Sequence, residues 1–84
     1  MSTLEKLRGK LKARPKTYNW DDMKRVLADF GYLEKTGGKT SGSRIKFTHP
    51  NASPILLHKP HPSNEVKKYA IDLVVDKLEM EGFL

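Results

Sequence analysis

The 84-residue sequence contains no cysteine, which excludes a disulfide framework, a thiolate zinc site and thiol catalysis. It also lacks long apolar runs: the longest are three residues, as at Ile55–Leu57, far too short to cross a bilayer. The first residues are charged rather than apolar, so no secretory signal is expected. A chain of this length folds as one domain with a small core, which leaves little room for a deep catalytic cavity. We therefore expect one soluble domain, cytoplasmic and not membrane-bound.

Acidic residues are also few. Ten Asp and Glu stand against sixteen Lys and Arg, which leaves a net charge of +6. The excess lies in two segments: residues 1–19 carry six basic side chains and one acidic one, and residues 32–62 carry five and one. Two basic segments separated by weakly acidic ones are typical of a protein that binds a polyanion such as nucleic acid. A general excess of solubilising lysines is the alternative.

Hydrophobic spacing and turn residues predict the element order α-α-β-β-β-α. Helices are expected over residues 3–12, 20–30 and 64–81, and strands over residues 32–36, 43–49 and 55–59. Asn19 and Asn64 are the expected N-caps of the second and third helices, and Pro15 ends the first. Gly31 is the expected glycine after the end of the second helix. Strands joined by short turns pair antiparallel, and a three-stranded meander sheet with its helices on one face is an α+β sandwich.

The second and third helices are expected to supply most of the core. In the second, the apolar face consists of Trp20, Met23, Val26, Leu27 and Phe30. In the third, the buried stripe consists of Val66, Tyr69, Ala70, Leu73, Val74 and Leu78, and Gly82 ends the helix so that Phe83 and Leu84 return to the core. Residues 1–19 are expected to be a basic N-terminal extension, and removal of residues 1–16 is expected to leave a folded domain but to weaken RNA binding.

A more specific signal lies in residues 42–62. The run Gly42-Ser43-Arg44-Ile45-Lys46-Phe47-Thr48-His49-Pro50 is followed by Ile55-Leu56-Leu57-His58-Lys59-Pro60-His61-Pro62 and by a helix that ends in Glu-Gly-Phe-Leu. With this spacing, residues 20–84 resemble the HicA family, toxins of type II toxin–antitoxin pairs whose fold is similar to a double-stranded-RNA-binding domain. The resemblance implies an mRNA interferase that is held inactive by a HicB antitoxin.

One position departs from the family's pattern. The family's Gly-Ser-His motif carries its catalytic histidine at the start of the second strand, and the residue at that position here is Arg44. A guanidinium stays protonated and cannot act as a general base. Two possibilities therefore remain open: another histidine transfers the proton, or this variant binds RNA and cleaves it poorly.

The alternation of side chains along a strand groups the candidate residues. If Ile45 and Phe47 face the helices, then Arg44, Lys46 and His58 lie on the opposite, open face of the sheet. Such a group can hold a phosphate through its cations and move a proton through its histidine. An ordinary solvated sheet face with polar residues is the alternative.

Further residues are expected to assist RNA binding. Lys39, Ser43, Lys59 and His61 join Arg44 and Lys46 as the predicted RNA-binding residues. The Gly-rich segment 37–42 lacks the ending of a P-loop, so it is expected to be a hairpin connection that touches the RNA backbone. No carboxylate or thiolate near His58 and His61 completes a metal site, so we expect neither a metal nor another cofactor. Tyr32 is a weaker candidate for stacking on a base.

The sequence therefore predicts an RNA-binding toxin with Arg44 and His58 at its catalytic centre, with mRNA and a HicB-like antitoxin as its partners. A non-catalytic RNA-binding module of the same fold is the main alternative. In a third interpretation, the open sheet face serves only to be covered by an acidic antitoxin.

Overall fold

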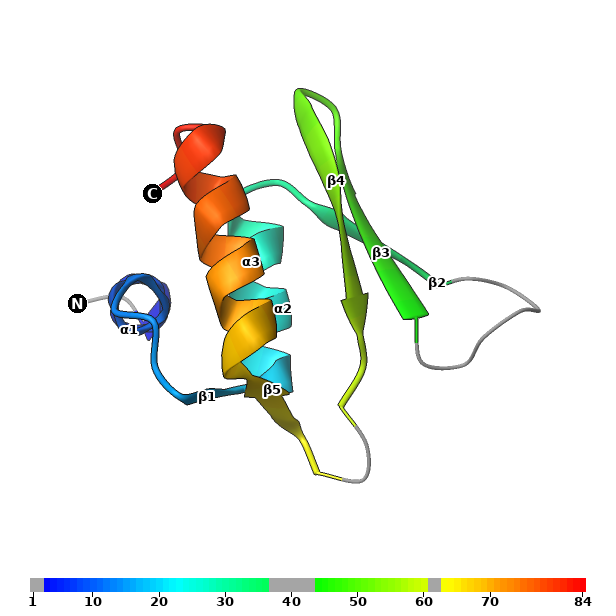
Figure 1. Cartoon of the computed structure of the whole chain (residues 1–84). Coiled ribbons are helices and arrows are strands. Elements are labelled where there is room, and N and C mark those ends of the chain that lie inside the picture. Colours follow the sequence, from blue (N-terminus) through cyan, green and yellow to red (C-terminus); the bar gives the residue numbers. More distant parts are fainter. Residues whose placement is uncertain (1–2, 37–43, 61–62) are drawn as a thin grey trace.

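The computed structural model describes residues 3–36, 44–60 and 63–84 of the chain, and Figure 1 shows their arrangement. The elements are α1 (Thr3–Lys12), β1 (Thr17–Asn19), α2 (Trp20–Asp29), β2 (Leu33–Thr36), β3 (Arg44–His49), β4 (Ala52–His58), β5 (Glu65–Lys67) and α3 (Lys68–Met80). β2, β3 and β4 form an antiparallel meander, with the helices on one face of it. The predicted α+β class is confirmed, and with it the likeness to the double-stranded-RNA-binding-domain fold.

The sheet has one buried face and one open face. On β3, Ile45 and Phe47 are buried, while their neighbours Arg44 and Lys46 are exposed. β4 repeats the pattern, because its inward side chains pair with those of β3 in the register Ile45↔Leu57 and Phe47↔Ile55. The ring of Phe47 meets the edge of Trp20 from α2 at a centroid distance of 6.0 Å. These contacts fasten the sheet to the helices.

α2 begins at the predicted residue and ends one residue before the predicted end. The Asn19 side chain accepts a hydrogen bond from the backbone N–H of Asp22 at 3.2 Å, as an N-cap does. Gly31 follows the helix with a φ of +102°, a left-handed conformation that residues with a Cβ rarely adopt. A Cβ at this position would also lie 2.9 Å from the His49 ring. Glycine is therefore required at position 31 both by the backbone angle and by the available space.

A two-stranded ribbon that the sequence did not predict joins the segments before α2 and α3. β1 and β5 pair antiparallel, and the central pair Tyr18↔Val66 is buried on the helix side. Strands of three residues are too short for alternation to be recognised in a sequence. The ribbon holds the first turns of α2 and α3 side by side at one end of the molecule (Figure 1).

The expectation of a helix over residues 64–81 is wrong at its start. Asn64 does not cap the third helix: its carbonyl accepts the N–H of Trp20 at 2.9 Å, and its side-chain amide donates to Asp21, so it serves α2. Residues 65–67 form β5, and α3 starts at Lys68 without any side-chain cap.

The predicted stripe on this helix is also partly wrong. The buried residues of α3 are Ile71, Val74, Val75 and Leu78. Tyr69 is instead 70% exposed, and Leu73 is exposed as well. A second apolar stripe with helical spacing, formed by Ile71, Val74, Val75 and Leu78, overlaps the predicted one in this segment. Because Val66 is fixed in β5, this second stripe faces the core. The predicted end is correct, since Gly82 has a φ of +84° and the N–H of Phe83 donates to the carbonyl of Leu78.

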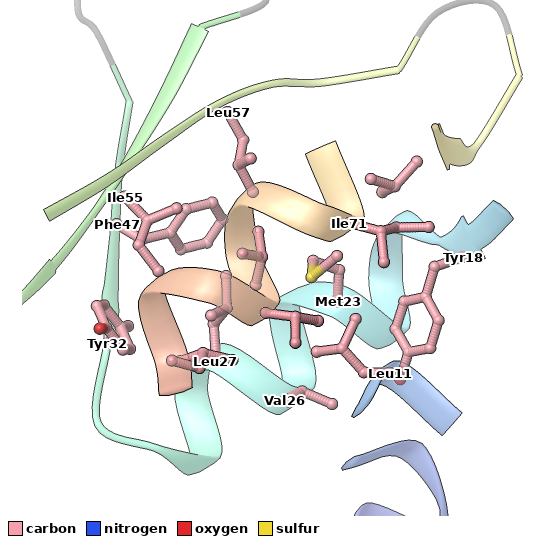
Figure 2. Close-up of a cluster of buried hydrophobic side chains, with 14 of the residues drawn as sticks. Leu11, Tyr18, Met23, Val26, Leu27, Tyr32, Phe47, Ile55, Leu57 and Ile71 are labelled. Atoms are coloured by element: carbon pink, nitrogen blue, oxygen red, sulfur yellow. The ribbon is translucent and has the colours of Figure 1, made fainter. Parts of the chain in front are cut away.

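α1 packs against α2 and α3 and belongs to the core (Figure 1). Leu11 is fully buried, and Figure 2 shows it with Tyr18 at one end of the core, beside Val26 of α2. The Tyr18 hydroxyl donates to the Leu7 carbonyl at 2.6 Å, and burial raises the pKa of this phenol to about 12, so it keeps its proton at neutral pH. The expectation that residues 1–16 are dispensable for folding is therefore not supported by their packing.

An ion-pair cluster adds to the attachment of α1. After α1 the chain passes through Arg14, whose guanidinium forms ion pairs with Asp72, Asp76 and Glu79 of α3. The hydrogen bond from Lys68 and then that from Arg14 lower the pKa of the Asp72 carboxyl. The cluster is exposed to solvent, so salt screens it and its contribution to stability is small.

Replacement of Leu11 tests the packing of α1. We expect Leu11→Ala to lower the free energy of unfolding by about 2–5 kcal/mol, because it removes a fully buried side chain and leaves a cavity. Urea denaturation followed by circular dichroism measures this, and the exposed Lys10→Ala on the same helix is the control, with an expected change within about 0.5 kcal/mol. Equal small effects of the two variants would show that α1 is a dispensable extension.

Candidate functional site

The candidate site is the face of the β2–β3–β4 sheet that the helices leave uncovered. Residues opposite each other on neighbouring strands share a face, and the register pairs Arg44 with His58, Lys46 with Leu56, and Lys35 with Lys46. All five side chains are exposed. Adding the pair Leu33↔Thr48, we define the open face as Leu33, Lys35, Arg44, Lys46, Thr48, Leu56 and His58. The predicted grouping of Arg44, Lys46 and His58 is thus present in the fold.

The open face is basic and carries no carboxylate. Within the described part of the chain, Lys35, Arg44 and Lys46 form no ion pair. The acidic residue on β2, Glu34, lies opposite the buried Phe47 and therefore on the other face of the sheet. The Nζ of Lys24 lies 4.0 Å from its Oε1. Three uncompensated cations on adjacent strands make this face attractive to phosphate groups.

Two exposed leucines accompany these cations. Leu33 is 63% exposed and Leu56 is 54% exposed, and both belong to the open face. Leu56 lies directly opposite Lys46, whereas Leu33 is on the edge strand β2. Apolar side chains of this size are usually buried, so their exposure here is consistent with a surface that a partner covers.

The histidines within the described residues have different roles. His58 is exposed on the open face and has no hydrogen-bond partner there. His49 is held at the other end of β3: its Nδ1 accepts the N–H of Asn51 at 2.9 Å, so Nε2 carries the proton and donates to the Phe30 carbonyl at 2.9 Å. Its ring packs against Tyr32 and Phe83. His49 is therefore a structural clamp between β3 and the end of α2, and His58 is the histidine available for chemistry.

The prediction for Tyr32 is wrong. Its side chain is buried, with its ring against His49 and Phe83, so it cannot stack on a base without unpacking. Burial raises the pKa of its hydroxyl, which has no hydrogen-bond partner among the described residues. Trp20, by contrast, is buried in the core as predicted.

A pocket of about 180 Å³ adjoins the open face at the end of β4. Its lining includes His58, Lys59, Ser63, Glu65, Lys67 and Tyr69, and we call it the His58 pocket. His58 belongs both to this pocket and to the open face, so the two surfaces are continuous. Lys59 and Lys67 form no ion pair within the described ranges.

Several predicted site residues cannot be placed by the structure. Lys39, Ser43 and His61 lie outside the described residues, whereas Lys59 is exposed immediately after β4. In the part of the chain that the structure describes, no group of three or more metal-ligating side chains comes together. No helix among those residues is long and apolar enough to cross a membrane.

Sequence reasoning missed Lys35, Leu33, Leu56 and Tyr69. Lys35 could have been found by extending the strand pairing to β2, since its register places it opposite Lys46. The exposure of Leu33 and Leu56 depends on which strand face the helices cover. For Tyr69 the helical spacing itself was misleading, because it indicated a buried position.

The chain matches one known protein family over most of its length. A family model described as the HicA toxin of bacterial toxin–antitoxin systems matches residues 20–80. The chain belongs to the HicA family. The matched range runs from the first residue of α2 to the last residue of α3, so it contains the open face and the His58 pocket, whereas α1 and β1 lie before it. Neither a curated protein nor a solved structure matches the chain.

The different roles of the two histidines can be tested by stability alone. We expect His49→Ala to lower the free energy of unfolding by about 1–3 kcal/mol, because it leaves a backbone N–H and a carbonyl without partners. His58→Ala is the matched variant and should change it by no more than about 0.5 kcal/mol, since its side chain is exposed. Urea denaturation of the two proteins measures this difference. A larger loss for His58→Ala than for His49→Ala would reverse the two assignments.

Proposed function

We propose that this HicA-family protein is an endoribonuclease toxin that binds and cleaves mRNA and is neutralised by a HicB-type antitoxin. The observation that carries the proposal is the cross-strand pair of Arg44 and His58 within a basic face that has no carboxylate. Side chains directly opposite on antiparallel strands have Cβ atoms about 5 Å apart, close enough to contact the same phosphodiester group. Family membership supports the toxin assignment.

The proposed chemistry divides charge from proton transfer. Cleavage through the 2′-hydroxyl needs a group that accepts its proton, a group that protonates the leaving 5′-oxygen, and cations that stabilise the charged phosphorane. Arg44 keeps its charge throughout the usable pH range, so it is assigned to the phosphate together with Lys46. His58 is assigned to proton transfer, because histidine gains and loses a proton near neutral pH.

The exposed leucines support the proposed antitoxin partner. An RNA backbone has little use for Leu33 and Leu56, whereas a protein partner gains stability by burying them. An acidic partner would also neutralise Lys35, Arg44 and Lys46. An antitoxin that covers the open face in this way would exclude RNA from the same residues.

A second candidate function is RNA binding without cleavage. The observation that favours it is Arg44 itself, which occupies the position of the catalytic histidine that the resemblance to the family implies. The described part of the open face then contains a single histidine to perform both proton transfers.

The binding proposal predicts strong dependence on salt. The affinity for a single-stranded RNA should fall steeply between about 50 and 200 mM salt, because cations on the protein replace the counterions of the RNA. Lys46→Ala should reduce the slope of log affinity against log salt by about 0.7, the value of one contact to a single strand. Fluorescence anisotropy measures both quantities, with Arg25→Ala as the control, because Arg25 is an exposed cation of α2 outside the open face and both basic segments. An affinity that does not depend on salt, or equal effects of the two variants, would contradict phosphate binding at the open face.

The catalytic proposal predicts separate effects on binding and cleavage. His58→Ala should reduce RNA cleavage by roughly two to four orders of magnitude with little change in binding, because it removes the proton-transfer group. Arg44→Ala should weaken binding without moving the pH optimum of cleavage, and Arg44→His should increase cleavage. Gel analysis of a labelled RNA with chelator present measures the rates. If none of the proteins cleaves RNA although all of them bind it, the non-catalytic function replaces the proposed one.

A further inference from the structure

The His58 pocket has no role in the chemistry proposed above. Its position is nevertheless informative, because one wall is His58, which belongs to the open face, and another includes Tyr69 near the start of α3. A phosphate held between Arg44 and His58 would therefore lie next to this pocket.

The volume restricts the occupant to a small group. Pockets that enclose drug-sized ligands measure about 300–1,000 Å³. At about 180 Å³, the His58 pocket is smaller than this range and suits one ring system rather than an extended ligand. The lining is mixed. Pro60, Val66 and Ala70 are apolar, whereas Ser63 and Glu65 offer hydrogen-bonding atoms and Lys59 and Lys67 offer positive charge. An apolar side chain from a protein partner would leave these groups without partners, at a cost in free energy.

Tyr69 adds an aromatic surface. It is 70% exposed. Leu73 and Met80 of the same helix are exposed as well, but of the three only Tyr69 lines the His58 pocket. A planar aromatic ring beside polar and cationic groups is the arrangement with which proteins bind unpaired bases, which stack on the ring while cations contact the flanking phosphates. A base inside a duplex is covered on both sides by its neighbours and cannot stack in this way.

We infer that the His58 pocket binds one unpaired nucleobase, stacked on Tyr69, next to the phosphate that Arg44 and Lys46 contact. The inference rests on the proposed function and adds a substrate class to it: single-stranded RNA, or a strand from which one nucleotide is turned out. In this arrangement the base fixes which phosphodiester bond lies beside His58, so the pocket positions the strand and contributes affinity that a duplex does not receive.

Substitutions of Tyr69 test the inference. Binding is measured by fluorescence anisotropy with a short single-stranded RNA, 2′-O-methylated to prevent cleavage, and with the duplex of the same sequence. Tyr69→Ala should weaken single-strand binding by about 5- to 150-fold, the range for loss of one base–aromatic stack, and leave duplex binding unchanged. Tyr69→Phe keeps the ring and should bind like the parent protein. Met80→Ala is the matched control, because Met80 is an exposed residue of α3 outside the pocket.

A change in the RNA provides a second, independent measurement. An abasic nucleotide is placed at each position of the single strand in turn. At one position it should weaken binding to the parent protein by the same factor as Tyr69→Ala, and it should have no further effect on Tyr69→Ala itself. The series on the parent protein needs no variant, so a position-specific loss there tests the inference even if the Tyr69 variants do not fold.

The possible results distinguish a failure of the inference about the pocket from a failure of the proposed function. If Lys46→Ala weakens binding but Tyr69→Ala and the abasic series do not, the inference about the pocket is wrong and the proposed function stands. If neither Lys46→Ala nor Tyr69→Ala weakens binding, the proposed function fails. Equal losses for single strand and duplex would show that Tyr69 does not contact a base. An unchanged RNA affinity with weakened binding of the antitoxin would assign the pocket to the protein partner and overturn the inference.

Discussion

The rest of the structure depends on the alternation of side chains along β3 and β4. One set of alternating side chains, which includes Ile45 and Phe47, is buried against the helices, and the other set forms the open face. A slip of one residue in the pairing would exchange the two sets and bury the cations, so burial of the apolar set fixes the register. The same constraint places Arg44 opposite His58. The packing of the core therefore also brings the residues of the candidate site together.

One end of the sheet is fixed by contacts with the helix layer. At this end, the His49 ring joins β3 to the end of α2, and Gly31 leaves space for that ring. At the same end, the backbone N–H of Ser53 donates to the Glu81 side chain at 3.0 Å, which links the start of β4 to the residue after α3. These anchors lie at the end of β3 opposite Arg44, so they hold the sheet against the helices without occupying the candidate site.

Sequence reasoning predicted the parts of the fold that local chemistry determines. The cap at Asn19 and the left-handed Gly31 were recognisable because each residue meets a requirement of its own backbone. The β1–β5 ribbon was not, because each strand is three residues long and is stabilised by a partner more than forty positions away in the sequence. The capping role of Asn64 for α2 is equally non-local. Tyr69 was assigned to the core because two apolar stripes overlap in α3, and only the packed structure selects between them.

The open face combines cations with exposed leucines, so an RNA and a protein partner would bind it through different interactions. Its cations favour a polyanion, while Leu33 and Leu56 gain stability only when a protein covers them. The RNA affinity supplied by the cations falls as salt rises, whereas the burial of leucines depends little on salt. Under the proposed function, a protein partner that uses both features would therefore lose less of its affinity than RNA as the salt concentration rises. Arg44 supports binding of either kind, since its permanent charge attracts an acidic partner or a phosphate at every usable pH but cannot transfer a proton. Exchange of the catalytic histidine for arginine would thus shift the balance of this face from chemistry toward binding.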